Sequence, residues 1–176
     1  MEHSVRAWRP SRARPRRWLT RTRALSFADR RNVRYLHLQF NYLESLPRDV
    51  GKLDMLRDLD LSNNAIEELP LELGRCSRLR VLKCAHNNLR ELPVTLSECS
   101  VLEEVHANDN RIEGVPAEFG ALKELRVLYL HNNRLTSLPS ELGGIPTLEE
   151  ARVPRRRRRA RSKRSLTCLR APCRTD

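Results

Sequence analysis

The stretch LRDLDLSNNAIEELPLELG, from Leu56 to Gly74, is one copy of a unit that occurs five times in the chain. Its second asparagine recurs every 23 residues without drift, and a proline follows each recurrence six residues later. The asparagines are Asn41, Asn64, Asn87, Asn110 and Asn133, and the prolines are Pro47, Pro70, Pro93, Pro116 and Pro139. A fixed period in this range indicates a solenoid, whose units bury a core only by stacking on one another.

Seven columns of the aligned repeats are apolar throughout, although only 39% of the chain is hydrophobic. In the second repeat they are Leu56, Leu59, Leu61, Ile66, Leu69, Leu73 and Cys76. The alternation at Leu59 and Leu61 predicts a short strand with one buried face. Repeats begin at residues 33, 56, 79, 102 and 125, and a partial one begins at 148. The sequence therefore predicts five to six short strands that stack in parallel at about 4.8 Å.

The asparagine column predicts a structural ladder. Where the chain turns inside the stack, an asparagine side chain can donate to and accept from backbone groups that would otherwise lack partners. On the return side, proline breaks regular pairing, and the Leu-Gly or Leu-Ser pair that follows permits a tight irregular turn or a short helical piece. Because this side is broader than the strand side, we expect the array to curve into a horseshoe.

The pattern resembles the leucine-rich repeat, L-x-x-L-x-L-x-x-N-x-L followed by x-x-L-P-x-x-L-G-x-L. It is most similar to the intracellular group of Ras-pathway scaffolds and cell-polarity proteins, and the resemblance covers about residues 33 to 153. It implies an α/β-type solenoid with a strand-lined concave face. It also implies a signalling GTPase or a phosphatase as the protein partner.

Domain boundaries follow from where the pattern starts and stops. We expect a disordered arginine-rich tail over 1–24, a half-repeat cap over 25–32, the repeat domain over 33–153 and a disordered polybasic tail over 154–176. Pro154 and five arginines occupy the place where the sixth turn is due. Two interpretations stay open: a truncated or alternatively ended product, or a natural tail after a degenerate final repeat.

Charge separates the tails from the repeats. Residues 1–31 carry ten arginines against two acidic residues, and residues 151–176 carry eleven basic residues against one acidic residue. Residues 32–150 carry 13 basic and 19 acidic residues, so the repeats are mildly acidic. The tails are therefore candidates for binding nucleic acid or an anionic membrane, for nuclear localisation, or for organelle import. No apolar stretch approaches the length of a membrane span.

Cysteines favour a reducing, intracellular compartment, most simply the cytoplasm. Cys76, Cys84 and Cys99 fall in apolar columns, the total of five is odd, and no cysteine cluster flanks the repeats as a disulfide cap would.

The candidate binding site is the outward row of side chains on successive strands. It comprises Tyr35, His37, Asp58, Asp60, Lys83, Glu104, His106, Tyr129 and His131. Aromatic, histidine and acidic side chains on a rigid sheet suit a protein partner. No nucleophile-elbow, phosphate-loop, zinc-protease or dinucleotide motif occurs, so the sequence predicts no enzyme, no cofactor and no metal.

Two function classes follow. The first is an intracellular scaffold or adaptor that docks a folded protein on the concave face, in signal transduction by resemblance. The alternative is a basic-tail protein that binds nucleic acid or anionic membrane, with the solenoid as a passenger.

Overall fold

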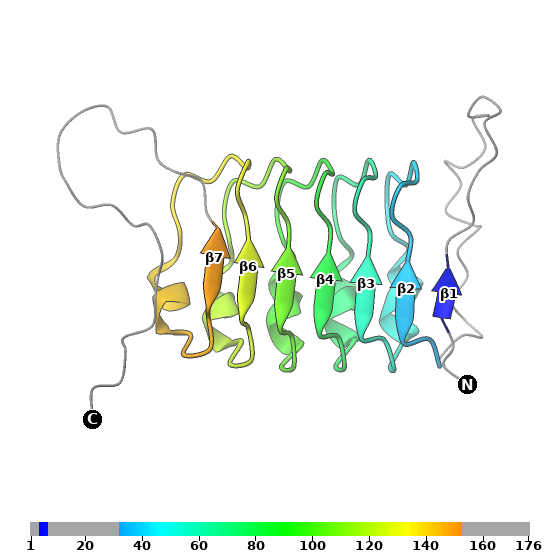
Figure 1. The fold of residues 1–176 in the computed structure, drawn as a ribbon, viewed down its shortest axis with the longest axis horizontal. Helices are drawn as coiled ribbons and strands as arrows, with labels where there is room; N and C mark the ends of the chain where they lie inside the picture. Colours follow the sequence, from blue (N-terminus) through cyan, green and yellow to red (C-terminus); the bar gives the residue numbers. More distant parts are fainter. Residues whose placement is uncertain (1–3, 7–31, 153–176) are drawn as a thin grey trace.

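The computed structural model describes residues 4–6 and 32–152. Within them, seven parallel strands form one sheet in chain order. The strands are β1 (Ser4–Arg6), β2 (Tyr35–His37), β3 (Asp58–Asp60), β4 (Val81–Lys83), β5 (Glu104–His106), β6 (Val127–Tyr129) and β7 (Glu150–Arg152). Short 3-10 helices return the chain behind the sheet (Figure 1); they are η2 (Arg48–Lys52), η3 (Leu71–Arg75), η4 (Val94–Glu98), η5 (Ala117–Ala121) and η6 (Ser140–Gly144). The predicted solenoid is confirmed.

The 23-residue period sets the register of the sheet. Leu59 of β3 pairs with Leu36 on one side and Leu82 on the other, so equivalent residues stack from β2 to β7. The central side chain of each strand from β2 to β6 is buried, and its two neighbours are half-buried on the outer face. One hydrophobic core therefore runs the length of the array between the sheet and the 3-10 helices.

Three column positions depart from the predicted core. Leu43 and Leu135 are only partly buried, and Leu138 is 39% exposed. For the residues of the fifth repeat the reason is geometric: in a solenoid each side chain is covered by the next unit, and among the described residues only the short strand β7 follows.

Glycine acts through close approach, rather than by permitting a tight turn. No described glycine has a positive φ. A Cβ added at Gly51 or Gly74 would lie 2.5 or 2.4 Å from the backbone oxygen of Glu72 or Thr95 in the next repeat. At these two positions the absent side chain lets η2 approach η3 and η3 approach η4.

The first strand was not expected from the sequence. β1 (Ser4–Arg6) lies within the segment predicted as a disordered tail, yet it pairs in parallel with β2 and extends the sheet by one strand. The rest of 1–24, the cap predicted over 25–32 apart from Asn32, and the tail 154–176 lie outside the described residues.

Among the residues that the structure describes, none forms a helix long and apolar enough to cross a bilayer.

Candidate protein-binding face

The outer face of the sheet, which we call the sheet face, brings the predicted site residues into register. His37, Asp60, Lys83, His106 and Tyr129 stand on successive strands as one central column. A flanking column holds Tyr35, Asp58 and Glu104, and His131 follows β6 on the other flank. Because neighbouring strands are about 4.8 Å apart, these side chains form a continuous surface.

The end of the sheet face near β7 carries a connected aromatic and charged cluster. The Tyr129 hydroxyl donates to Glu150 Oε2 at 2.8 Å, and Arg152 Nε donates to Glu150 Oε1 at 2.7 Å. The Arg152 guanidinium lies 4.9 Å from the centre of the Tyr129 ring, where the cation interacts with the ring face. Two strands thus hold Tyr129 in one orientation.

Histidine continues this cluster. The His106 ring meets Tyr129 edge to face with centroids 4.8 Å apart, and His106 Nε2 lies 2.9 Å from Glu104 Oε2. The bond to Glu150 raises the pKa of the Tyr129 phenol. In turn Tyr129, and then Arg152, hold the pKa of Glu150 below its usual value. Glu150 and Arg152 continue the same two columns in the sequence, but the candidate set did not include them.

The half of the sheet face near β2 has fewer contacts between side chains. His37 Nε2 lies 3.5 Å from Asp58 Oδ1, and Asp60 Oδ1 accepts the backbone N–H of Ser62 at 2.9 Å. Lys83 makes no side-chain bond to another described residue. A partner would therefore meet the unpaired ammonium group of Lys83 here and a fixed cluster near β7.

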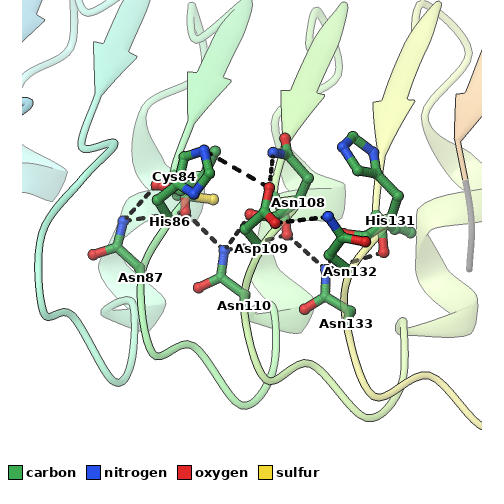
Figure 2. A network of polar contacts seen from close by, with 12 residues as sticks. Cys84, His86, Asn87, Asn108, Asp109, Asn110, His131, Asn132 and Asn133 are labelled. Carbon is green, nitrogen blue, oxygen red and sulfur yellow. Dashed lines mark hydrogen bonds and ion pairs between the residues drawn. The ribbon is translucent and has the colours of Figure 1, made fainter.

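The asparagine side chains bridge successive repeats. Asn87 Oδ1 accepts the backbone N–H of Ile66, and its Nδ2 donates to Leu61 O and Cys84 O at 3.0 and 3.1 Å. Asn64, Asn110 and Asn133 make the equivalent bonds, and Figure 2 shows the last three members of the row. Among described residues, Asn41 donates to Leu38 O and Gln39 O of its own repeat, and the residues one period before it lie outside the described range. The ladder thus joins the five repeats pairwise.

The comparisons with known families agree with this geometry. The model described as "Leucine-rich repeat and WD repeat-containing protein 1, LRR" matches residues 14–116, more than half of the chain. The chain belongs to the leucine-rich repeat family. A second leucine-rich repeat model, of two copies, matches residues 100–149. Leucine-rich repeat domains are generally protein-binding modules.

Solved leucine-rich repeat structures share the fold. A leucine-rich repeat protein of Leptospira interrogans is 33% identical, with a TM-score of 0.68 over 70% of this chain and 31% of that one. The ectodomain of the Arabidopsis thaliana receptor kinase GASSHO1/SCHENGEN3, solved with CASPARIAN STRIP INTEGRITY FACTOR 2, is 31% identical, with a TM-score of 0.63 over 71% of this chain and 16% of that one. The complex PEPR1-AtPEP1 is 29% identical, with a TM-score of 0.67 over 70% and 18%.

These relatives are longer proteins. The present leucine-rich repeat chain spans less than a third of the length of each of the three. No curated protein sequence matches it.

Each leucine-rich repeat here also has a residue with positive φ, directly before its asparagine. These residues are Phe40, Asn63, His86, Asp109 and Asn132, with φ from 54° to 58°. Asp109 connects three repeats, because its carboxylate accepts from Asn108 at 2.6 Å and Asn132 at 2.7 Å and lies 3.7 Å from His86 Nε2 (Figure 2). The bond from Asn108, followed by that from Asn132, holds the pKa of Asp109 below its usual value.

Proposed function

We propose that this chain is an intracellular interaction scaffold or adaptor that docks a folded protein on the sheet face, without catalysis of its own. The observation that carries the proposal is the cluster at Tyr129. A tyrosine fixed by Glu150, Arg152 and His106 presents a rigid aromatic surface whose ordering cost is already met before binding.

Two further lines support a binding role. Two related structures are complexes, one of a leucine-rich repeat ectodomain with CASPARIAN STRIP INTEGRITY FACTOR 2 and one of PEPR1 with AtPEP1. The resemblance to intracellular scaffolds suggests a role in signal transduction, with a signalling GTPase or a phosphatase as the partner.

The proposed location is the cytoplasm. Cys76, Cys84 and Cys99 are buried free thiols within the repeats. Free thiols are kept reduced in that compartment.

The test combines changes on the sheet face. Asp60→Asn, His106→Ala and Tyr129→Ala together should abolish capture of a protein partner from cell extract by the full chain, with little change in the thermal midpoint. Asparagine at position 60 keeps an acceptor for the Ser62 N–H. Arg75→Ala, Glu98→Ala and Glu118→Ala, all exposed on the 3-10 helices, form the control and should leave capture intact.

The alternative function makes the opposite prediction. A protein that acts through its basic tails keeps capture in the sheet-face variant. It loses capture when Arg155–Arg164 is deleted, and its binding falls steeply with salt. That combination would contradict the scaffold and establish the tail as the binding element.

A further inference from the structure

Phe40 holds a backbone conformation that suits it poorly. Its φ is 57°, a region that asparagine and aspartate enter far more readily than a bulky aromatic residue. The equivalent residues of the other repeats are asparagine, histidine or aspartate. Phe40 buries little in exchange, because it is 73% exposed, and Tyr42 two residues later is 67% exposed. Backbone strain that no burial offsets is typical of functional surfaces.

The two rings lie on the edge where the chain leaves each strand, which we call the exit edge and which is uppermost in Figure 1. The exit edge of the first three repeats also carries exposed carboxylates, namely Glu44, Glu67, Glu68 and Glu91. Among described residues, only Glu67 of these four has an ion-pair partner, Arg90 at 4.0 Å, and both side chains are more than half exposed.

The arginines of the exit edge lie mostly toward its other end. Arg111 and Arg134 are exposed in the fourth and fifth repeats, where Glu113 is the exposed carboxylate at the corresponding part of the repeat. The edge is therefore aromatic and acidic near β2 and becomes more basic toward β7. A cationic ligand is favoured on the first three repeats and disfavoured on the last two.

Arginine is the side chain that matches this surface. Its planar guanidinium stacks on exposed aromatic rings and forms paired hydrogen bonds with carboxylates. Several unpaired carboxylates beside two rings thus favour an arginine-rich segment over a neutral one.

The chain carries such a segment shortly after β7 in sequence. All strands are parallel, so Arg152, the last residue of β7, lies at the exit end of its strand, like the last residue of every other strand (Figure 1). Arg155–Arg164, RRRRRARSKR, contains eight basic residues and no acidic one. The five inter-strand spacings from β7 to β2 sum to about 24 Å. The twelve residues from 153 to 164 can extend to about 40 Å.

We propose that Arg155–Arg164 binds within the same molecule to the exit edge of the first three repeats, at Phe40, Tyr42, Glu44, Glu67, Glu68 and Glu91. In the bound form the edge competes with nucleic acid and anionic membranes for the polybasic segment. The solenoid then regulates how much of the polybasic segment is free to bind other ligands.

A spin label on the full chain tests the contact. With Cys173→Ser, a nitroxide is attached at Cys168, close to the polybasic segment in sequence. Burial raises the pKa of the Cys76 and Cys84 thiols to about 12 and that of Cys99 to about 11, so these three stay unlabelled at neutral pH. We expect the label to broaden the amide signals of residues 40–44, 67 and 68.

Variants that remove equal numbers of negative charges distinguish binding at the exit edge from a general electrostatic attraction to the acidic solenoid. Glu44→Gln, Glu67→Gln and Glu68→Gln together should abolish most of the broadening. Glu98→Gln, Glu124→Gln and Glu149→Gln, exposed carboxylates away from the exit edge, should leave it unchanged.

Phe40→Asn tests the aromatic part without risk to the fold. Asparagine fits the positive φ, so the thermal midpoint should hold or rise while the broadening weakens. Undiminished broadening in this variant overturns the proposal. So does broadening centred on Asp58 and Asp60 of the sheet face, or broadening that passes only between molecules in a mixture of spin-labelled and isotope-labelled chains.

Discussion

At the residue scale, two adjacent turn positions have different roles in every repeat. The asparagine in each of repeats 2 to 5 supplies bonds that two neighbouring turns need, so its energetic role depends on burial between repeats. The residue before it must accept a positive φ, and its side chain is free to differ. At this position the Asp109 carboxylate contacts Asn108, Asn132 and His86, which come from three repeats. At the same position of the first repeat, the Phe40 ring is largely exposed to solvent.

Replacing Asn87 by alanine should destabilise the protein by about 1 to 3 kcal/mol. The change leaves the Ile66 N–H and the Leu61 and Cys84 carbonyls without this partner inside the stack. Replacing Lys83, which faces outward, should cost no more than about 0.5 kcal/mol. Urea unfolding of both variants measures the difference, and equal mild effects would contradict a structural ladder.

Replacing Asn108 by alanine should raise the pKa of the Asp109 carboxyl toward its ordinary value of 3.8, because the Asn108 amide is the largest cause of the lowering. A lowered pKa contributes stability that is present above the ordinary value and is lost as the pH falls through the folded one. Carboxyl NMR titration checks the shift. Ser62→Ala, at the equivalent position of the second repeat, is the control and should leave it unchanged.

At the element scale, stacking of the 3-10 helices decides which glycines matter. Gly74 and Gly143 occupy the same position in their repeats. A Cβ at Gly74 would meet Thr95 O at 2.4 Å, whereas a Cβ at Gly143 would meet nothing within 4 Å. The difference arises because η4 lies against η3, while among described residues no further 3-10 helix follows η6.

Gly74→Ala should therefore destabilise the protein by about 1 to 3 kcal/mol, since the neighbouring backbone must move. Gly143→Ala should stay within about 0.5 kcal/mol of the parent. Thermal or urea unfolding of the two variants, which introduce the same methyl group, isolates the stacking contact. A similar cost for both would show that glycine is needed for the local turn instead.

At the scale of the whole molecule, the two candidate binding surfaces lie on different sides of the solenoid and near opposite ends of it. The sheet face holds its fixed cluster near β7, and the exit edge holds its aromatic and acidic surface near β2. A partner on the sheet face and the polybasic segment on the exit edge would occupy different surfaces. Both could then be bound at the same time.

The 23-residue period by itself determined the repeated strands, their parallel register and nearly all of the core. It could do so because in a solenoid each residue packs against its equivalent one period away, and the sequence displays that neighbour directly. The asparagine columns were readable for the same reason. The candidate sheet-face residues followed from the alternation within each strand.

Only the tertiary structure decided what periodicity cannot encode. Leu138 is exposed and Gly143 faces open space because, among described residues, no further 3-10 helix follows their repeat. Strand β1 pairs with β2 through backbone groups, which every residue except proline can supply, so the repeat pattern did not predict it. The Tyr129–Glu150–Arg152 cluster and the Asp109 network depend on which orientations neighbouring side chains adopt. A repeated sequence specifies the contacts between equivalent positions of neighbouring repeats. The polar clusters form where the residues at equivalent positions differ, so the repeat pattern does not specify them.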